Sequence, residues 1–324
     1  MRKSATLLAL AAAGALALTA CSGGGSEAPA SGGEGESGGL TPITVGVMPI
    51  VDVAAIYVGV DEGFFEEEGL DVTLELAQGG AAITPAVVSG DYQFGFSNVT
   101  SLLLGTANGV PLQAVSAANF STGTEPDIGA VVVPGDSDIQ SSADLAGHTV
   151  AVNTLNNIGD STIRNVVEND GGDPESLQFV EMGFPDMPAA VSSKQVDAAW
   201  ILEPHLTRAL NDGARVVSWN FMETDPDLMI SAYFTSKPYA AENPEVVASF
   251  TKAMQKSLAF AEENPDATRA ILDQYTKIDD DIKATMTMPR FDTEINTDSV
   301  QLLADLALKY GMVDEAVDIT QLLP

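Results

Sequence analysis

The sequence has little of what disulfide frameworks, metal centres and nucleic-acid binding require. It contains 1 Cys and 2 His among 324 residues, and its 14 Lys and Arg stand against 46 Asp and Glu. A single Cys excludes a disulfide scaffold and a multi-cysteine zinc or iron–sulfur centre. A net charge of −32 at pH 7 argues against a nucleic-acid partner, because binding to phosphates needs a cationic surface.

Enzyme signatures are also missing. The chain after residue 40 contains no GxSxG elbow, no P-loop, no HExxH motif and no Cys nucleophile. What the chain does have is 45% apolar residues, which is enough to bury a substantial core. Its length is typical of about two domains.

The N-terminus has the pattern of a bacterial lipoprotein signal. Arg2 and Lys3 precede an unbroken run of Leu, Ala and Gly at positions 7–18. This run is short against the ~20 residues that span a bilayer, so it indicates a secretion signal. It is followed by the tetrapeptide LTAC, which ends at Cys21 and resembles a lipobox. We expect residues 1–20 to be a signal peptide and Cys21 to be lipidated, the alternative being a stray Cys beside an ordinary cleavage site.

The residues after Cys21 are rich in Gly and Ser. Positions 22–39 hold 8 of the 29 Gly and no large apolar side chain. Such a stretch buries too little apolar surface to offset the entropy of ordering. We therefore expect 21–40 to be a flexible tether that holds the folded body at the extracytoplasmic face of the cell membrane through the lipid anchor.

From residue 41 onward, short apolar runs alternate with segments of helical period, which predicts an α/β fold with parallel strands. Two series of such units are followed by a mainly helical tail, which we expect to pack on the first series. The predicted lobes are 41–130 plus 235–324 for lobe 1 and 131–234 for lobe 2. Extended segments at 128–133 and 231–235 are expected to carry the chain between them.

A set of short motifs, in order along the chain, carries a family resemblance. They include GFFEEEGLDV from Gly63, SADLAG from Ser142, VDAAW from Val196 and the pair Glu203-Pro204. Together they resemble the nitrate/sulfonate/taurine substrate-binding family of ABC importers, which also includes binders of the thiamine pyrimidine. The resemblance covers most of 41–236.

This resemblance implies a type II periplasmic-binding-protein fold, with two α/β lobes joined by two crossover strands and a ligand in the cleft between them. It implies a binding protein that is not an enzyme, carries no cofactor and acts as a monomer. The implied partners are a small-molecule ligand, an ABC permease and the ATPase subunit of that permease.

The candidate ligand residues follow from where open α/β sheets bind their ligands. Ligands lie beyond the carboxyl ends of strands, where helix N-termini offer free N–H groups. Four strand-to-helix junctions qualify. The predicted ligand-binding residues are Asp52, Ser97, Asn98, Thr154, Asn156, Asn157, Trp200 and Glu203. For each of them, helix capping, turn formation or core packing is the alternative.

The charge of these junctions bears on the ligand. They contain Asp52, Asp160 and Glu203 but no Lys or Arg. A neutral or zwitterionic ligand is therefore favoured over a strongly charged anion, because a carboxylate can pair with an amine. This places taurine-like molecules and aminopyrimidines ahead of nitrate.

Two other classes of protein fit the sequence less well. Fungal thiamine-pyrimidine synthases share the implied fold, but they have a reactive Lys, a catalytic His and a Cys-rich motif. This chain has no Cys beyond Cys21, which disfavours the synthase alternative. A structural or adhesive lipoprotein lacks support because no sequence repeat is present.

Overall fold

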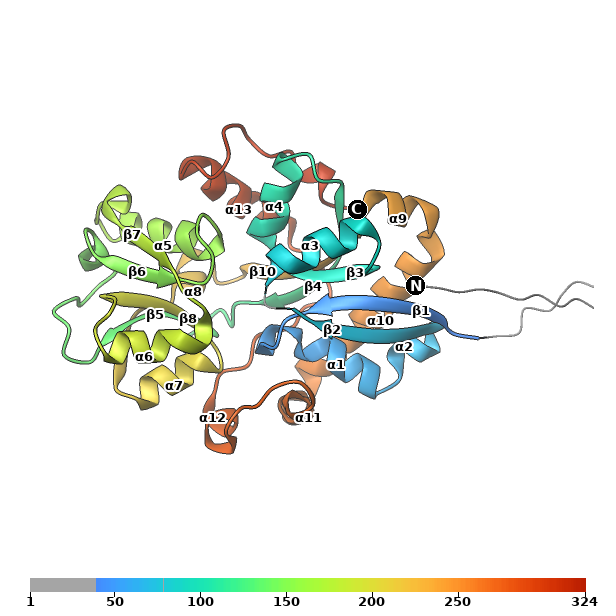
Figure 1. Cartoon of the computed structure of the whole chain (residues 1–324), viewed down its shortest axis with the longest axis horizontal. Helices are drawn as coiled ribbons and strands as arrows, with labels where there is room; N and C mark the ends of the chain where they lie inside the picture. The colour runs from blue at the N-terminus through green and yellow to red at the C-terminus, as the bar shows by residue number, and fades with distance from the viewer. Residues whose placement is uncertain (1–38, 78) are drawn as a thin grey trace, which may run out of the picture. The chain divides into compact units, whose positions relative to one another are not determined.

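The structure is a computed structural model that describes residues 39–77 and 79–324 (Figure 1). The expected signal peptide, the lipidation of Cys21 and all but the last two residues of the tether lie outside the described residues. Within the part that is described, no helix combines the length and the apolar character needed to cross a membrane.

Five strands form a first sheet in the order β2-β1-β3-β10-β4. Strand β1 pairs in parallel with β2 and β3, whereas β10 runs antiparallel to β3 and β4. The sheet is therefore mixed, because the strand that returns late in the chain opposes the parallel set. Its strands are β1 (Thr41–Val47), β2 (Leu70–Leu76), β3 (Phe94–Asn98), β4 (Leu112–Phe120) and β10 (Met229–Ser236).

Helices cover both faces of this sheet. Val45 of β1 belongs to one buried cluster with Ile56 and Phe250, while Phe234 of β10 belongs to another with Leu102. The two clusters arise because successive side chains of a strand point to opposite faces. The helices of this part are α1 (Ala54–Asp61), α2 (Phe64–Glu67), α3 (Gly80–Ser89), α4 (Val99–Ala107), α9 (Lys237–Glu242), α10 (Pro244–Glu263), α11 (Pro265–Ala270), α12 (Asp280–Thr285) and α13 (Thr297–Lys309).

A second five-stranded sheet has the order β7-β6-β8-β5-β9. Strand β6 is parallel to β7 and β8, and β5 is antiparallel to β8 and β9. Helix α5 packs with α8, and α6 packs with α7. The elements are β5 (Gly129–Pro134), β6 (Thr149–Val152), α5 (Ile158–Asn169), β7 (Gln178–Glu181), α6 (Met187–Ser192), β8 (Ala198–Leu202), α7 (His205–Asn211), β9 (Ala214–Ser218) and α8 (Asn220–Thr224).

Short 3₁₀ turns join several of these elements. They are η1 (Val51–Val53), η2 (Ala143–Leu145), η3 (Pro174–Ser176), η4 (Phe184–Asp186), η5 (Ile271–Gln274) and η6 (Ile319–Gln321). The first of them, η1, follows the carboxyl end of β1, and this is where the site begins.

The chain passes between the sheets at 121–128 and 225–228, and not along the extended segments that the sequence pattern suggests. Strand β5 pairs on both edges inside the second sheet, and β10 pairs on both edges inside the first. Fully buried apolar runs need partners for all their backbone groups, so they lie inside sheets rather than between them. The expected lobe limits at 130 and 235 are wrong to this extent: residues 129–130 belong to the second sheet and 229–234 to the first.

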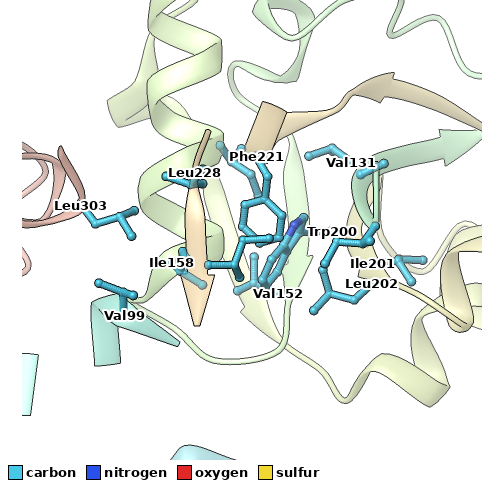
Figure 2. Packing of buried hydrophobic residues seen from close by; sticks show 14 of the residues in the cluster. Val99, Val131, Val152, Ile158, Trp200, Ile201, Leu202, Phe221, Leu228 and Leu303 are labelled. Atoms are coloured by element: carbon cyan, nitrogen blue, oxygen red, sulfur yellow. The ribbon is translucent and has the colours of Figure 1, made fainter. Parts of the chain in front are cut away.

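One buried cluster extends from the second sheet to helices of the first. Figure 2 shows it running from Trp200 and Phe221 through Ile158 to Val99 and Leu303. Helix α5 contacts both α4 and α13, so the start of α5 lies against elements of the first sheet. This contact brings the strand ends of the two sheets near one another.

Candidate ligand-binding site

Buried polar atoms without a hydrogen-bond partner mark the candidate site. Leaving such an atom unpaired in a protein interior costs about 1–3 kcal/mol, and native structures hold few of them. Among the described residues, the first sheet and its connections supply five unpaired polar atoms, and the second sheet and its connections supply three. They are Asp52 Oδ2, Ser97 Oγ, Thr100 Oγ1, Asn119 Oδ1, Tyr233 Oη, Asp160 Oδ1, Trp200 Nε1 and Asn220 Oδ1.

Asp52 is the buried carboxylate of the first sheet. It lies in η1, directly after β1, with 2% of its surface exposed. Its Oδ1 accepts a hydrogen bond from Asn119 Nδ2 at 3.0 Å, while Oδ2 has no partner. Burial raises the pKa of Asp52 to about 6, and the charge of Asp127 adds to this. The carboxylate therefore lacks a partner for its charge.

Three tyrosines surround this end of the first sheet. The rings of Tyr57 and Tyr275 stack with centroids 3.9 Å apart, and the Tyr275 hydroxyl donates to the carbonyl of Ile50 at 3.1 Å. Burial, together with the nearby Tyr57 and the charge of Asp52, raises the pKa of Tyr233 well above its usual value. The Tyr233 hydroxyl therefore stays protonated, and it has no partner.

Asp160 is the corresponding carboxylate of the second sheet. It lies in the first turn of α5, and its Oδ2 accepts from the backbone N–H of Asn156 at 2.8 Å. The other oxygen, Oδ1, has no partner. Burial raises the pKa of Asp160 to about 6. Both sheets thus present a buried carboxyl group with one occupied oxygen and one unpaired oxygen.

Trp200 packs against the same turn of α5. A Cβ at Gly159 would lie 2.6 Å from the indole Cε3, so only glycine allows this approach. Phe184 and Phe221 contact the indole edge-on, at centroid distances of 5.6 and 5.5 Å. Trp200 is thus a core side chain, which was the alternative to ligand binding for this residue. Its Nε1 nevertheless has no hydrogen-bond acceptor.

The starts of α4 and α5 touch directly. Asn157 Nδ2 donates to Ser101 Oγ at 3.0 Å. Asn157 Oδ1 also accepts from the N–H of Ile158 at 2.9 Å, and Asn98 Oδ1 accepts from the N–H of Ser101 at 2.8 Å. Asn98 and Asn157 therefore cap helices, and Asn157 additionally joins the two groups of elements.

Thr154 and Asn156 lie in the exposed loop before α5. Asn156 adopts a left-handed backbone conformation with φ 52°, which Asn tolerates better than most residues. In the structure, its contribution to the site is the backbone N–H that holds Asp160. Thr154 has no polar contact that would place it with the other candidates.

Glu203 is buried, with both carboxylate oxygens occupied. Oε2 accepts from the N–H of Thr207 at 3.0 Å, and Oε1 accepts from the Thr207 hydroxyl at 2.8 Å and from the N–H of Thr287 at 3.2 Å. Burial raises its pKa. The carboxylate thus holds the start of α7 and the segment before Met288, and it has no unpaired oxygen for a ligand.

Five residues with unpaired polar atoms are absent from the predicted ligand-binding residues, namely Thr100, Asn119, Asp160, Asn220 and Tyr233. Asn119 lies in a strand whose other residues are mostly apolar, and a buried amide in such a run is the signal that could have identified it. Asp160 lies in one of the strand-to-helix junctions, so its position carried a signal. Thr100, Asn220 and Tyr233 carry none, because a Thr or Asn at the start of a helix and a Tyr inside a strand are common in any core.

Two surface recesses lie elsewhere. One of about 380 Å³ is lined by residues that include Asp136, His148 and Lys194. The other, of about 480 Å³, is lined by residues that include Asn108 and Asp318. None of the eight residues with unpaired atoms lines either recess. The candidate site is therefore the set of buried polar residues and not a surface recess.

The two sheets, with the chain crossing twice between them, define a periplasmic binding protein fold. The alkanesulfonate-binding protein SsuA of Xanthomonas axonopodis pv. citri, bound to MOPS, matches with a TM-score of 0.72 at 16% identity, over 88% of this chain and 99% of that chain. The expected fold class is confirmed.

Residues 50–268 match the family model described as NMT1/THI5 like, and the chain belongs to this family. The formylaminopyrimidine-binding protein of Halalkalibacterium halodurans is 25% identical over 224 residues, covering 67% of this chain and 64% of that protein. The taurine-binding periplasmic protein of Escherichia coli is 26% identical over 199 residues, covering 60% and 58%. The match spans less than two thirds of either relative's length. Both relatives are named as binding proteins, and the family resemblance is confirmed.

Proposed function

We propose that the chain is the extracytoplasmic solute-binding component of an ABC importer. Its lobes close around a small molecule of the sulfonate, taurine, nitrate or thiamine-pyrimidine type and deliver it to a permease driven by an ATPase subunit. The observation that carries this proposal is the set of eight unpaired polar atoms, contributed by strands of both sheets and by the turns and helices that follow them. A ligand that satisfies atoms of both sheets stabilises the closed state, because only that state offers all of them.

The lipid anchor is part of the same proposal. Acylation at Cys21 and a tether at 21–40 hold the receptor at the outer face of the cell membrane, where a monomer can reach the permease. The lobes move as rigid bodies about the crossings at 121–128 and 225–228, which replace the hinge positions expected from the sequence.

The synthase alternative has less support. The residues with unpaired atoms include no Lys, His or Cys, and the chain has no Cys after Cys21. Carboxylates, amides and hydroxyls are groups that bind a solute by hydrogen bonds, and both relatives are named as binding proteins.

A thermal-shift screen tests the proposal. The purified chain from residue 39 onward is heated with sulfonates, taurine, nitrate and pyrimidines, and with sodium chloride as the matched salt control. A ligand at a hundred times its Kd adds about 2.7 kcal/mol to the free energy of unfolding. We expect at least one of these classes to raise Tm. If none of them raises Tm above the salt control at millimolar concentration, the proposed function fails.

A further inference from the structure

We infer that the ligand carries hydrogen-bond donor groups, cationic or neutral N–H, on two sides, with one side bound by Asp52 and the other by Asp160. Molecules whose only polar group is an anion are excluded. This inference rests on the proposed function and narrows its ligand to amine-bearing molecules.

The unpaired atoms are mostly acceptors. Four of the eight are carboxylate or amide oxygens, which accept hydrogen bonds when the carboxyl groups are ionised, and three are hydroxyls, which can donate or accept. Only Trp200 Nε1 is restricted to donating. A sulfonate or nitrate consists of acceptor oxygens, and only the three hydroxyls and the indole could donate to it. A ligand rich in N–H groups can instead donate to the carboxylate and amide oxygens, which have no other role than to accept.

The hydrogen bonds fix which atom of each amide faces the site. Asn119 must direct its Nδ2 to the Asp52 carboxylate, which accepts, so its Oδ1 remains unpaired. Asn220 Nδ2 donates to Thr162 Oγ1 at 2.8 Å. The proton of that hydroxyl goes to the carbonyl of Ile158 at 2.7 Å, so the hydroxyl can only accept from Asn220. Asn119 therefore adds an acceptor amide oxygen beside Asp52, whereas Asn220 leaves an unpaired acceptor oxygen on α8, which packs against α5.

Within residues 39–77 and 79–324, no cation forms an ion pair with either carboxylate. Among the ion pairs of the described residues, none includes Asp52 or Asp160. Arg164 is the cation that favours ionised Asp160, and its guanidinium pairs with Glu175 at 3.5 Å. The charged side chain that influences Asp52 is Asp127, whose negative charge raises the pKa of Asp52 further. An anionic ligand would meet two like charges, whereas an amine would compensate them.

A series of contacts connects the surroundings of the two carboxylates. Ser231 of β10 pairs with Asn119 on one edge and with Asn98 on the other. Adjacent strands are about 4.8 Å apart, so Asn119, which binds Asp52, lies roughly 10 Å from Asn98. Asn98 caps α4, and Ser101 of α4 touches Asn157, one turn before Asp160. These contacts link the surroundings of Asp52 to the turn of α5 that carries Asp160.

Calorimetric titration of four probes tests the inference: an aminomethyl aminopyrimidine and putrescine, which carry amines on two sides, against ethanesulfonate and nitrate. We expect at least one diamine to bind and neither anion to bind. Asp52→Asn and Asp160→Asn should each weaken the diamine about tenfold or more, the scale of a hydrogen bond to a charged group. Asp91→Asn, which removes one negative charge from an exposed turn, is the matched control and should leave the affinity unchanged.

The outcomes separate this inference from the proposed function. Tight binding of ethanesulfonate or nitrate overturns the inference and leaves the receptor function standing. Diamine binding that neither site substitution weakens more than Asp91→Asn also overturns it. If none of the four probes binds at millimolar concentration, the inference fails, while the wider thermal-shift screen still decides the proposed function. Circular dichroism shows whether each variant is folded, and if one is not, the other decides.

Discussion

Replacing Asp52 by Asn should stabilise the ligand-free protein. The substitution keeps the shape of the side chain and the acceptor oxygen that Asn119 uses, and it removes a buried charge that no cation compensates. The pKa of Asp52 rises from 3.8 to about 6 through burial. A difference of about two pKa units, at 1.36 kcal/mol each, makes ionised Asp52 cost about 3 kcal/mol of folding stability.

The sign and the pH range follow from the raised pKa. In the unfolded chain the carboxyl group ionises near pH 4, whereas in the folded protein it stays protonated until about pH 6. The folded state therefore binds the additional proton between these values, and the free energy of unfolding falls as pH rises from about 4 to 6. Asn does not titrate, so the variant avoids this loss. Its advantage should reach about 3 kcal/mol at pH 8 and vanish near pH 4.

Urea denaturation of the wild-type protein and the variant at pH 8 and pH 4 measures this difference. Asp127→Asn is the matched control, because Asp127 is buried and its oxygens accept from the Ser121 hydroxyl at 2.7 Å and from the N–H groups of Thr122 and Ile128 at 3.0 and 2.8 Å. That variant should lose about 1–3 kcal/mol at pH 8. If Asp52→Asn also loses stability at pH 8, or gains equally at both pH values, the view of Asp52 as an uncompensated charge is wrong.

Three further predictions concern the anchor, the packing at α5 and the contact between helices. Cys21→Ala in the native host should move the protein from the detergent phase to the aqueous phase or block processing; a native chain that begins well past residue 21 would refute the anchor. Gly159→Ala places a Cβ 2.6 Å from the Trp200 indole and should cost about 1–3 kcal/mol in thermal unfolding, so an unchanged Tm contradicts the packing. Lys309 of α13 pairs with Glu168 of α5 at 2.7 Å, so Lys309→Met should raise the radius of gyration of the ligand-free protein in small-angle scattering; an equal radius means that this ion pair does not hold the lobes together.

Local patterns in the sequence are sufficient to predict most of the secondary structure. The alternation of strands and helices and the glycine at the end of the first helical segment follow from short-range signals, and Gly69 indeed has the left-handed φ of 80°. The apolar segment after β1 forms η1, α1 and α2 in succession, and Gly63, with a φ of 75°, separates α1 from α2. The family motifs are local as well, and they predict the fold class correctly.

The same short-range signals identify where a site begins but not which side chains are unpaired. Asp52, Ser97 and Trp200 are predicted from their positions after strands, and the structure leaves each with an unpaired polar atom. Glu203 occupies an equivalent position, yet Thr287, 84 residues further along the chain, occupies one of its oxygens. Which donors reach a carboxylate depends on the tertiary fold, so the sequence could not distinguish Glu203 from Asp52.

By itself, the sequence determined the α/β architecture, the family and the strand ends at which polar side chains gather. Only the tertiary structure decided the strand order, which places β10 in the first sheet and brings Tyr233 to the site. The same holds for Asn119 and Asn220, whose unpaired oxygens are set by hydrogen bonds to Asp52 and Thr162 over separations of 67 and 58 residues. Pairing over such separations depends on how elements pack, and a local pattern of residue types does not contain that information.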